Sequence, residues 1–307
     1  SENHKVSVID DFSSGKRTNL RSHSDFMGNN NGKNENLTIY ERSICDNLDD
    51  IFESNNFNAV FHVGAIPRVQ YSIKNPEKSH NANVNGTFNV LQAAKAAGVK
   101  RFIYAASSSC YGIPEQYPTK EDAEILPQYP YALTKRLGEE LVLHWAKLYG
   151  LGALSLRFFN VYGPRSRTSG TYGAVFGVFL AQKLANKPLT IVGTGNQTRD
   201  FIHVYDLVEA MILIAQKNKN CEIYNLGSGK ETSINYIADI ISDNKVYIPK
   251  RPGEPDRSLA DISKINSELN WQPKISIDEG IKMLMKNINE WKEAPVWTPE
   301  SIEQATN

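Results

Sequence analysis

Tyr131 and Lys135 stand four residues apart in the segment YALTK, and Ser107 opens a run of three serines upstream. Residues at this spacing lie on one face of a helix, one turn apart. A nearby ammonium group favours the phenolate form of tyrosine and lowers its pKa from about 10 toward the neutral range. A serine at the end of a strand can hydrogen-bond the same phenolic oxygen. The three residues therefore predict proton transfer to or from a hydroxyl group, with Tyr131 as the acid and base.

The elements that must position these side chains alternate along the first half of the chain. Strands are expected at residues 5–10, 37–44, 58–65, 100–109 and 151–165, and helices at residues 87–99 and 131–150. This order predicts an α/β fold with a doubly wound parallel sheet, followed beyond Pro164 by a smaller and less regular lobe. Ligands of such sheets bind at the carboxyl ends of the strands, which is where Ser107 lies.

The composition argues against several classes of partner. The chain has 307 residues, with 34 Lys and Arg balanced by 34 Asp and Glu, so charge gives no case for nucleic acid or an anionic membrane as a partner. No apolar run reaches the ~18 residues that would cross a bilayer. The three cysteines lack metal-ligand spacing, which predicts free thiols in a reducing compartment, a cytoplasmic location and no metal site.

Nine motifs, taken in their order along the chain, resemble those of a known protein family. The segments, in order, are VIDDFSSG, VFHVGAIPRVQYS, NVNGTFNVLQAA, SSSCYG, YALTK, LRFFNVYGPR, TRDFIHVYDL, YNLGSG and RPGEPDRSLADISKINSELNW. Together they resemble the extended short-chain dehydrogenases/reductases, in the branch that modifies nucleotide sugars. The resemblance covers nearly the whole chain. It implies a Rossmann-type sheet, NAD as the cofactor, a nucleotide sugar as the substrate and, by analogy, a homodimer.

The resemblance also implies a division of the chain. Residues 1–164, with about 200–225, would form the NAD-binding domain, and residues 165–199 and 226–307 the nucleotide-sugar-binding lobe. In this family a central strand and a glycine-rich turn precede the acid-ended strand that begins here, and neither is in this sequence. We expect that the protein has such a segment before this chain. There are two alternatives to this expectation. Either the segment is supplied separately, or the protein is a truncated form that cannot hold NAD.

The cofactor-facing positions follow from the same resemblance. Asp10 would bind the ribose hydroxyls, and an acid there favours NAD over NADP because a 2′-phosphate would be repelled. Asn85 matches the family's structural asparagine, with a turn or cap residue as the alternative. The implied cofactor-binding residues are Asp10, Asp11, Phe12, Ser14, Gly64, Ala65, Lys135 and Phe158.

The substrate-facing positions decide which reaction is predicted. The implied substrate-binding residues are Ser109, Asn160, Arg199, Arg251 and Ser258, with the segment PLTIVG (188–193) along the base. Family dehydratases carry an Asp-Glu pair directly after the catalytic Ser or Thr, where this chain has Ser108 and Ser109. The sequence therefore predicts C4 epimerisation of a UDP-hexose.

Two pairs of sugars fit this prediction, and two other functions stay open. The small Ser258 leaves room for an N-acetyl group, so UDP-GlcNAc/UDP-GalNAc stands beside UDP-Glc/UDP-Gal. A nucleotide-sugar 4-dehydrogenase, for which a GDP-sugar is one candidate substrate, would use the same residues. A non-catalytic nucleotide-sugar binder is the third possibility, and the intact Ser107, Tyr131 and Lys135 argue against it.

Overall fold

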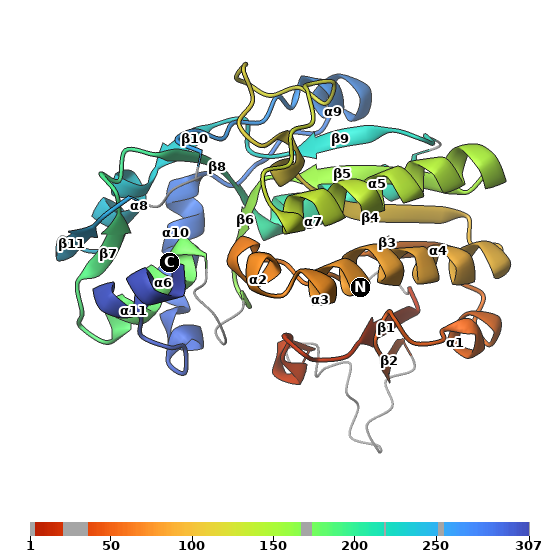
Figure 1. Ribbon diagram of the computed structural model, residues 1–307, viewed down its shortest axis with the longest axis horizontal. Helices are drawn as coiled ribbons and strands as arrows, with labels where there is room; N and C mark the ends of the chain where they lie inside the picture. The colour runs from red at the N-terminus through yellow and green to blue at the C-terminus, as the bar shows by residue number, and fades with distance from the viewer. Residues whose placement is uncertain (1–3, 21–35, 167–173, 218, 251–254, 307) are drawn as a thin grey trace.

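The structure is a computed structural model, and it describes residues 4–20, 36–166, 174–217, 219–250 and 255–306 (Figure 1). The predicted substrate residue Arg251 lies outside the described residues. Within the described part of the chain, no helix is both long and apolar enough to cross a membrane.

The main sheet is parallel and covered on both faces, which confirms the predicted α/β fold. Its strands, in spatial order, are β3 (Ala59–His62), β4 (Arg101–Ser107), β5 (Gly152–Phe158) and β9 (Ile223–Leu226). Phe102, Tyr104 and Ala106 of β4 face α4 (Gly86–Ala96) and α5 (Pro130–Tyr149), while Ile103 faces α7 (Val204–Gln216). This alternation follows from the two-residue period of a strand.

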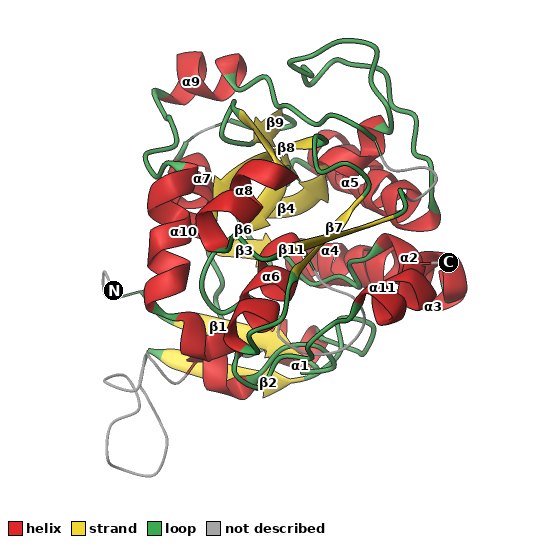
Figure 2. Cartoon of the chain, turned by 90° about the vertical axis from the view of Figure 1, so that its left-hand side faces the viewer, coloured by secondary structure: helices red, strands yellow, loops and turns green. Residues whose placement is uncertain are grey.

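A second parallel ladder pairs β1 (Val6–Asp10) with β2 (Leu37–Glu41), and it places Asp10 opposite Glu41. Among the described residues no ladder joins this pair to β3. The pair lies beyond β3 in both Figure 1 and Figure 2. Val6 of β1, and Phe61 and Val63 at β3, are exposed apolar side chains.

The helices between β2 and β4 begin with α1 (Asp49–Glu53) and α2 (Val69–Lys74) and continue with α3 (Pro76–His80). A π turn, η2 (Asn81–Asn85), joins α3 to α4, so that one helical run extends from Pro76 to Ala96. Such π turns insert one extra residue into a helix and often mark functional sites. After β4 the chain enters the 3₁₀ turn η3 (Ser108–Tyr111).

The second lobe has its own apolar core and gathers on the left of Figure 1 and at the front of Figure 2. Its strands are β6 (Asn160–Tyr162), β7 (Leu189–Val192), β8 (Thr198–His203), β10 (Glu231–Ser233) and β11 (Lys245–Ile248). Its helical segments are α6 (Val175–Leu184), α8 (Ile234–Ile241), α10 (Ile277–Lys286), η4 (Ile288–Trp291) and α11 (Pro299–Thr306). The lobes differ from the predicted division in more than one place. α9 (Ser263–Leu269) packs with β9 and α7 of the main sheet. Conversely, β6 and the end of β8, predicted for the NAD-binding domain, contribute Tyr162 and Phe201 to the core of the second lobe.

Candidate active site

Ser107 and Tyr131 meet at the carboxyl end of β4. Ser107 is the last residue of the strand, and its Oγ accepts hydrogen bonds from the backbone N–H of Ser109 at 3.2 Å and from the Ser109 hydroxyl at 2.8 Å. The phenol of Tyr131 is hydrogen-bonded to the Ser107 side chain. The structure therefore brings Tyr131 of the motif YALTK to Ser107 and Ser109 of the motif SSSCYG.

The first turn of α5 carries Tyr131 and is held by a residue that the sequence analysis missed. Pro130 occupies a first-turn position, where its missing N–H costs no hydrogen bond. The backbone N–H of Tyr131 donates to the Oγ of the buried Ser72 at 3.0 Å. Since the first N–H groups of a helix have no partner within it, Ser72 satisfies one of them and fixes the start of α5.

Lys135 lies one turn after Tyr131 and is only 4% exposed. Burial lowers the pKa of Lys135 from 10.5 to about 7. Burial also raises the pKa of Tyr131, and the hydrogen bond from Ser107 opposes that rise. The expectation that Lys135 lowers the pKa of Tyr131 below its ordinary value is therefore wrong for this structure. Burial penalises the phenolate and the ammonium alike, so the phenol of Tyr131 is neutral at neutral pH, while Lys135, with a pKa of about 7, can gain or lose its proton there.

Asn83, not Asn85, is the structural asparagine beneath the site. Its Oδ1 accepts from the backbone N–H of Ile66 at 2.7 Å, and its Nδ2 donates to Ile66 O at 3.1 Å and to Thr134 Oγ1 at 3.0 Å. Asn85 is exposed and donates only to Asn81 Oδ1 at 3.1 Å among the described contacts. Asn83 thus joins the loop after β3 to α5, at the residue directly before Lys135.

A buried polar cluster continues below Lys135. The Nζ of Lys135 lies 4.8 Å from the ring centroid of Tyr104, and His62 Nε2 is 2.9 Å from the Oγ1 of Thr87. Thr87 also donates to Asn83 O at 2.7 Å. Burial, followed by the charge of Lys135, lowers the pKa of His62 to about 3, so this imidazole stays neutral. The signal in the sequence is His62, a polar residue inside the otherwise apolar strand segment AVFHVGA.

Apart from Lys135 on α5, the predicted cofactor residues lie at or just after the carboxyl ends of three strands, β1, β3 and β5. Asp10 ends β1, and its Oδ1 accepts from the backbone N–H of Phe12 at 2.7 Å. Asp11 and Ser14 are exposed beside it. The guanidinium of Arg17, which the sequence analysis did not select, lies 4.3 Å from the Phe12 ring centroid and pairs with Glu41.

The remaining cofactor positions lie after β3 and at the end of β5. Gly64 and Ala65 follow β3 and are partly buried. Phe158, also partly buried, is the register partner of Ser107 in the main sheet. An acid after one strand and a small pair after another, on the same edge as Ser107 and Phe158, fit a dinucleotide laid across the carboxyl ends of the strands.

Of the predicted substrate residues, Ser109 lies beside Ser107 in the main lobe, while Asn160, Arg199 and Ser258 lie in the second lobe. Arg199 on β8 lines a cavity of about 320 Å³, which is formed by Val192, Gly193, Thr194, Asn196, Gln197, Arg199, Lys250, Pro255 and Asp256. Asn160 is exposed on β6, the strand that pairs with β8. Ser258 is partly buried after this cavity's last residues. The cavity thus combines Arg199 with part of the segment predicted to lie along a base.

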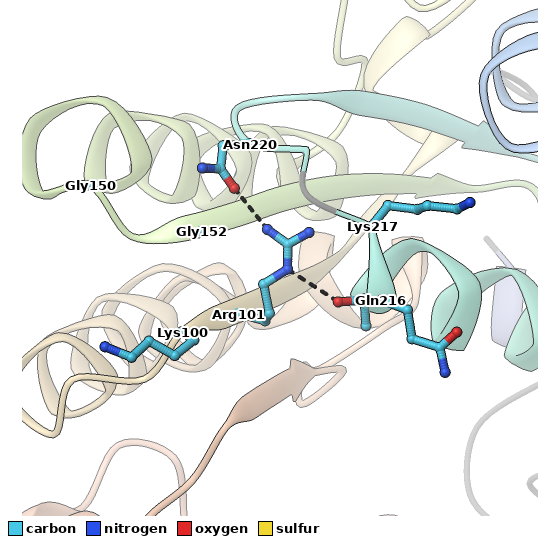
Figure 3. Close-up of a pocket in the computed structure, with 8 residues that line it drawn as sticks. Lys100, Arg101, Gly150, Gly152, Gln216, Lys217 and Asn220 are labelled. Carbon is cyan, nitrogen blue, oxygen red and sulfur yellow. Dashed lines mark hydrogen bonds between the residues drawn. The ribbon is translucent and has the colours of Figure 1, made fainter.

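A second cavity, of about 370 Å³, lies at the amino ends of β4 and β5, away from Ser107 (Figure 3). There Arg101 donates from Nε to Ala215 O at 3.1 Å, and from Nη1 to Lys219 O and Asn220 Oδ1 at 2.8 Å each. Ala215 lies in the last turn of α7, where a cation offsets the partial negative charge of the helix end. We therefore assign Arg101 a structural role.

Comparison with known proteins agrees with this geometry. The family model described as GDP-mannose 4,6-dehydratase matches residues 1–284. The UDP-glucose 4-epimerase of Mycolicibacterium smegmatis is 33% identical over 288 residues, which cover 91% of this chain and 89% of that protein.

Two solved structures are also similar. The UDP-N-acetylglucosamine 4-epimerase of Methanobrevibacter ruminantium M1, in complex with UDP-N-acetylmuramic acid, is 34% identical with a TM-score of 0.82, covering 92% of this chain and 91% of the other. The UDP-glucuronic acid 4-epimerase of Bacillus cereus, in complex with UDP-glucuronic acid and NAD, is 29% identical with a TM-score of 0.82, covering 93% and 91%. The matched family, the relatives and the Rossmann-type sheet together establish that this chain belongs to the GDP-mannose 4,6-dehydratase family, among the extended short-chain dehydrogenases/reductases related to nucleotide-sugar epimerases.

Proposed function

We propose that the protein is an NAD-dependent C4 epimerase of a UDP-hexose. The observation that carries this proposal is the hydrogen-bonded pair of Ser107 and Tyr131 beside Lys135, with serines at positions 108 and 109. Loss of water or of carbon dioxide from the sugar would call for an additional acid or base next to this pair. Two serines supply none, so the reaction that remains is removal and return of hydrogen at one carbon.

The residues that would hold NAD suit that cofactor. Asp10 is a partly exposed carboxylate at a strand end and can accept hydrogen bonds from ribose hydroxyls. Gly64 has no side chain to block a close approach, and Lys135 can donate to the second ribose. When bound, NAD supplies an acceptor and donor of hydride at the sugar's C4.

The side chains of the site would then move one proton. Tyr131 takes the proton of the 4-hydroxyl group as the C4–H bond breaks, and the Ser107 hydroxyl donates a hydrogen bond to the reacting oxygen. Lys135, protonated, stabilises the phenolate that Tyr131 becomes. If the 4-keto sugar then turned its other face to the bound cofactor and took hydride back there, Tyr131 would return the proton, and the product would be the C4 epimer with no net oxidation.

The test is incubation of the protein with UDP-GlcNAc, UDP-Glc and a GDP-hexose, with the sugar products read by NMR and NADH by its absorbance. We expect interconversion of a UDP-hexose and its C4 epimer without build-up of NADH. Accumulation of a keto sugar with NADH would instead establish a 4-dehydrogenase. Binding of a nucleotide sugar without turnover would establish a binder.

The identity of the sugar rests on Ser258. Replacing Ser258 with tyrosine places a bulky ring where we propose that the N-acetyl group lies. We expect turnover of UDP-GlcNAc to fall at least about tenfold while turnover of UDP-Glc changes by less than about threefold, because a filled pocket rejects the larger group. Initial rates on both sugars measure this effect, and Ser267→Tyr on the exposed side of α9 is the matched control. Equal effects on the two sugars would contradict the proposed role.

We further propose that the protein forms a homodimer through α4 and α5. Phe88 of α4 and Leu133, Leu148 and Tyr149 of α5 are exposed apolar side chains on these two helices. Burial of such a surface against a second copy would remove it from water. Sedimentation equilibrium at micromolar concentration tests this proposal, and a mass of one chain throughout would contradict it.

A further inference from the structure

Asp200 on β8 is a carboxylate with no exposed surface, and it joins three segments of the chain. Its Oδ1 accepts from the backbone N–H of Ser228 at 2.5 Å and from the Ser228 hydroxyl at 2.7 Å. Its Oδ2 accepts from the backbone N–H groups of Gly229 and Ala260, at 3.0 Å each. Each of these four donors is an uncharged N–H or O–H group.

The carboxylate of Asp200 is stable in this buried position only while its hydrogen bonds are kept. A buried carboxylate costs free energy unless its oxygens are fully hydrogen-bonded. Burial raises the pKa of Asp200, and the donors from Ser228, Ala260 and Gly229 oppose that rise. Because the donors are mostly backbone groups, the carboxylate keeps its hydrogen bonds only while the three segments hold their relative positions.

Gly227 packs so closely against Asp200 that this position has no room for a side chain. A Cβ atom added to Gly227 would lie 2.6 Å from Asp200 Oδ2 and 2.6 Å from the Cβ of Ala260. Glycine at this position therefore lets the turn approach both β8 and the segment around Ala260.

The joined segments are those that carry the substrate-facing residues. Arg199, directly before Asp200, lines the cavity of about 320 Å³. Ser258 stands two residues before Ala260. The segment is also tied to the main lobe, because Thr119 N donates to Leu259 O at 2.9 Å and Asp261 N donates to Thr119 O at 2.9 Å.

We propose that Asp200 is a positioning residue of the nucleotide-sugar site, whose carboxylate fixes the backbone of Arg199 relative to the segment that carries Ser258. This inference rests on the proposed function and adds to it. Under this proposal, two properties depend on the Asp200 side chain: the affinity for the uridine diphosphate of the substrate and the selection of the group at C2 of the sugar. Asp200 itself contacts neither of these groups.

The test compares Asp200→Asn with Asp206→Asn. Asp206 on α7 is also buried, at 2% exposed, but it accepts from Ile275 N at 2.9 Å and joins none of these segments. An amide cannot accept four donors, so we expect the KM of Asp200→Asn for the nucleotide sugar to rise about tenfold or more, with kcat changed less than about threefold. We also expect the ratio of rates on UDP-GlcNAc and UDP-Glc to change. Asp206→Asn should alter neither KM nor that ratio.

UDP affinity by calorimetry separates this inference from the proposed function, because it needs no turnover. If the wild-type protein binds UDP but turns over no sugar, the proposed function fails and the role of Asp200 is still measured. Gly227→Ala keeps the carboxylate and forces the segments apart, so we expect it to weaken UDP binding as well. If Asp200→Asn does not fold, UDP binding by Gly227→Ala tests the role of Asp200 in its place. If a folded variant, either Asp200→Asn or Gly227→Ala, had the same KM and the same UDP affinity as the wild-type protein, the inference would be overturned.

Discussion

Replacing Tyr131 with phenylalanine should lower kcat by about 10²- to 10⁴-fold, which is the range that a positioned acid–base group contributes. The change removes one oxygen, and with it the hydrogen bond to Ser107, while the ring stays in place at the start of α5. Affinity for the nucleotide sugar should change little, because the diphosphate and base lie in the second lobe under our proposal. Steady-state rates and UDP calorimetry on the same preparation measure the two effects.

Tyr205→Phe is the matched control for that experiment. Tyr205 lies on α7, is exposed and belongs to none of the proposed sites or interfaces, so it loses an equivalent oxygen away from Ser107. Its turnover should equal that of the wild type. If Tyr131→Phe kept more than half of the wild-type turnover, the phenol would not be the proton carrier, and the proposed reaction would need another acid.

Replacing Lys135 with methionine should have opposite effects on activity and on stability. Turnover should fall by at least about 10²-fold, since no ammonium remains to stabilise the phenolate. The free energy of unfolding should rise at low pH, because the wild-type protein must bury a charged amine there. The pKa of Lys135 is about 7 in the folded protein against an ordinary value of 10.5. The two values differ by an amount equivalent to a penalty on the order of 5 kcal/mol.

The sign of the pH dependence follows from those two values. Between pH 7 and 10.5 the unfolded chain binds a proton at Lys135 that the folded protein does not, so this lysine makes wild-type stability rise with pH across that range. The penalty is fully present below about pH 7 and vanishes above 10.5. The advantage of Lys135→Met should therefore be large at pH 6 and small near pH 10.

Urea unfolding of both proteins at the two pH values measures this difference. The dinucleotide content of each preparation must be measured too, since a ligand bound only to the folded state adds stability of its own. Lys147→Met, an exposed position in the last turn of α5, should show no such pH dependence. An equal advantage of Lys135→Met at both pH values would mean that Lys135 carries no buried charge.

The local parts of the site could be predicted from the sequence because they depend on short stretches of chain. A strand that ends in Ser107 and a helix that begins near Tyr131 follow from periodicity, and βα alternation fixes which edge of the sheet they share. The choice between Asn83 and Asn85 could not be made in the same way. Both stand in one Asn-x-Asn stretch, and the π turn at Asn81–Asn85, which a regular helical period does not predict, decides which of them faces Thr134.

The electrostatics of the site could not be predicted because they depend on burial. His62 and Tyr104 come from two different strands and meet beneath Lys135 only in the folded chain. A spacing of four residues gives the distance between Tyr131 and Lys135 but not the environment that sets their charges. The same holds for Asp200, whose donors come from segments far along the chain.

The π turn between α3 and α4 has a consequence for how this stretch can diverge among descendants. Each residue added to or removed from a helix turns everything beyond it by about 100°. The π turn already holds one extra residue, so deleting a position within Asn81–Asn85 would leave an ordinary helix with Thr87 still facing His62, whereas deleting one within Gly86–Val90 would carry Leu91 off the core. Over generations, exposed residues of α4 can be substituted freely while its length is conserved, and the π turn is the place where one residue can be lost.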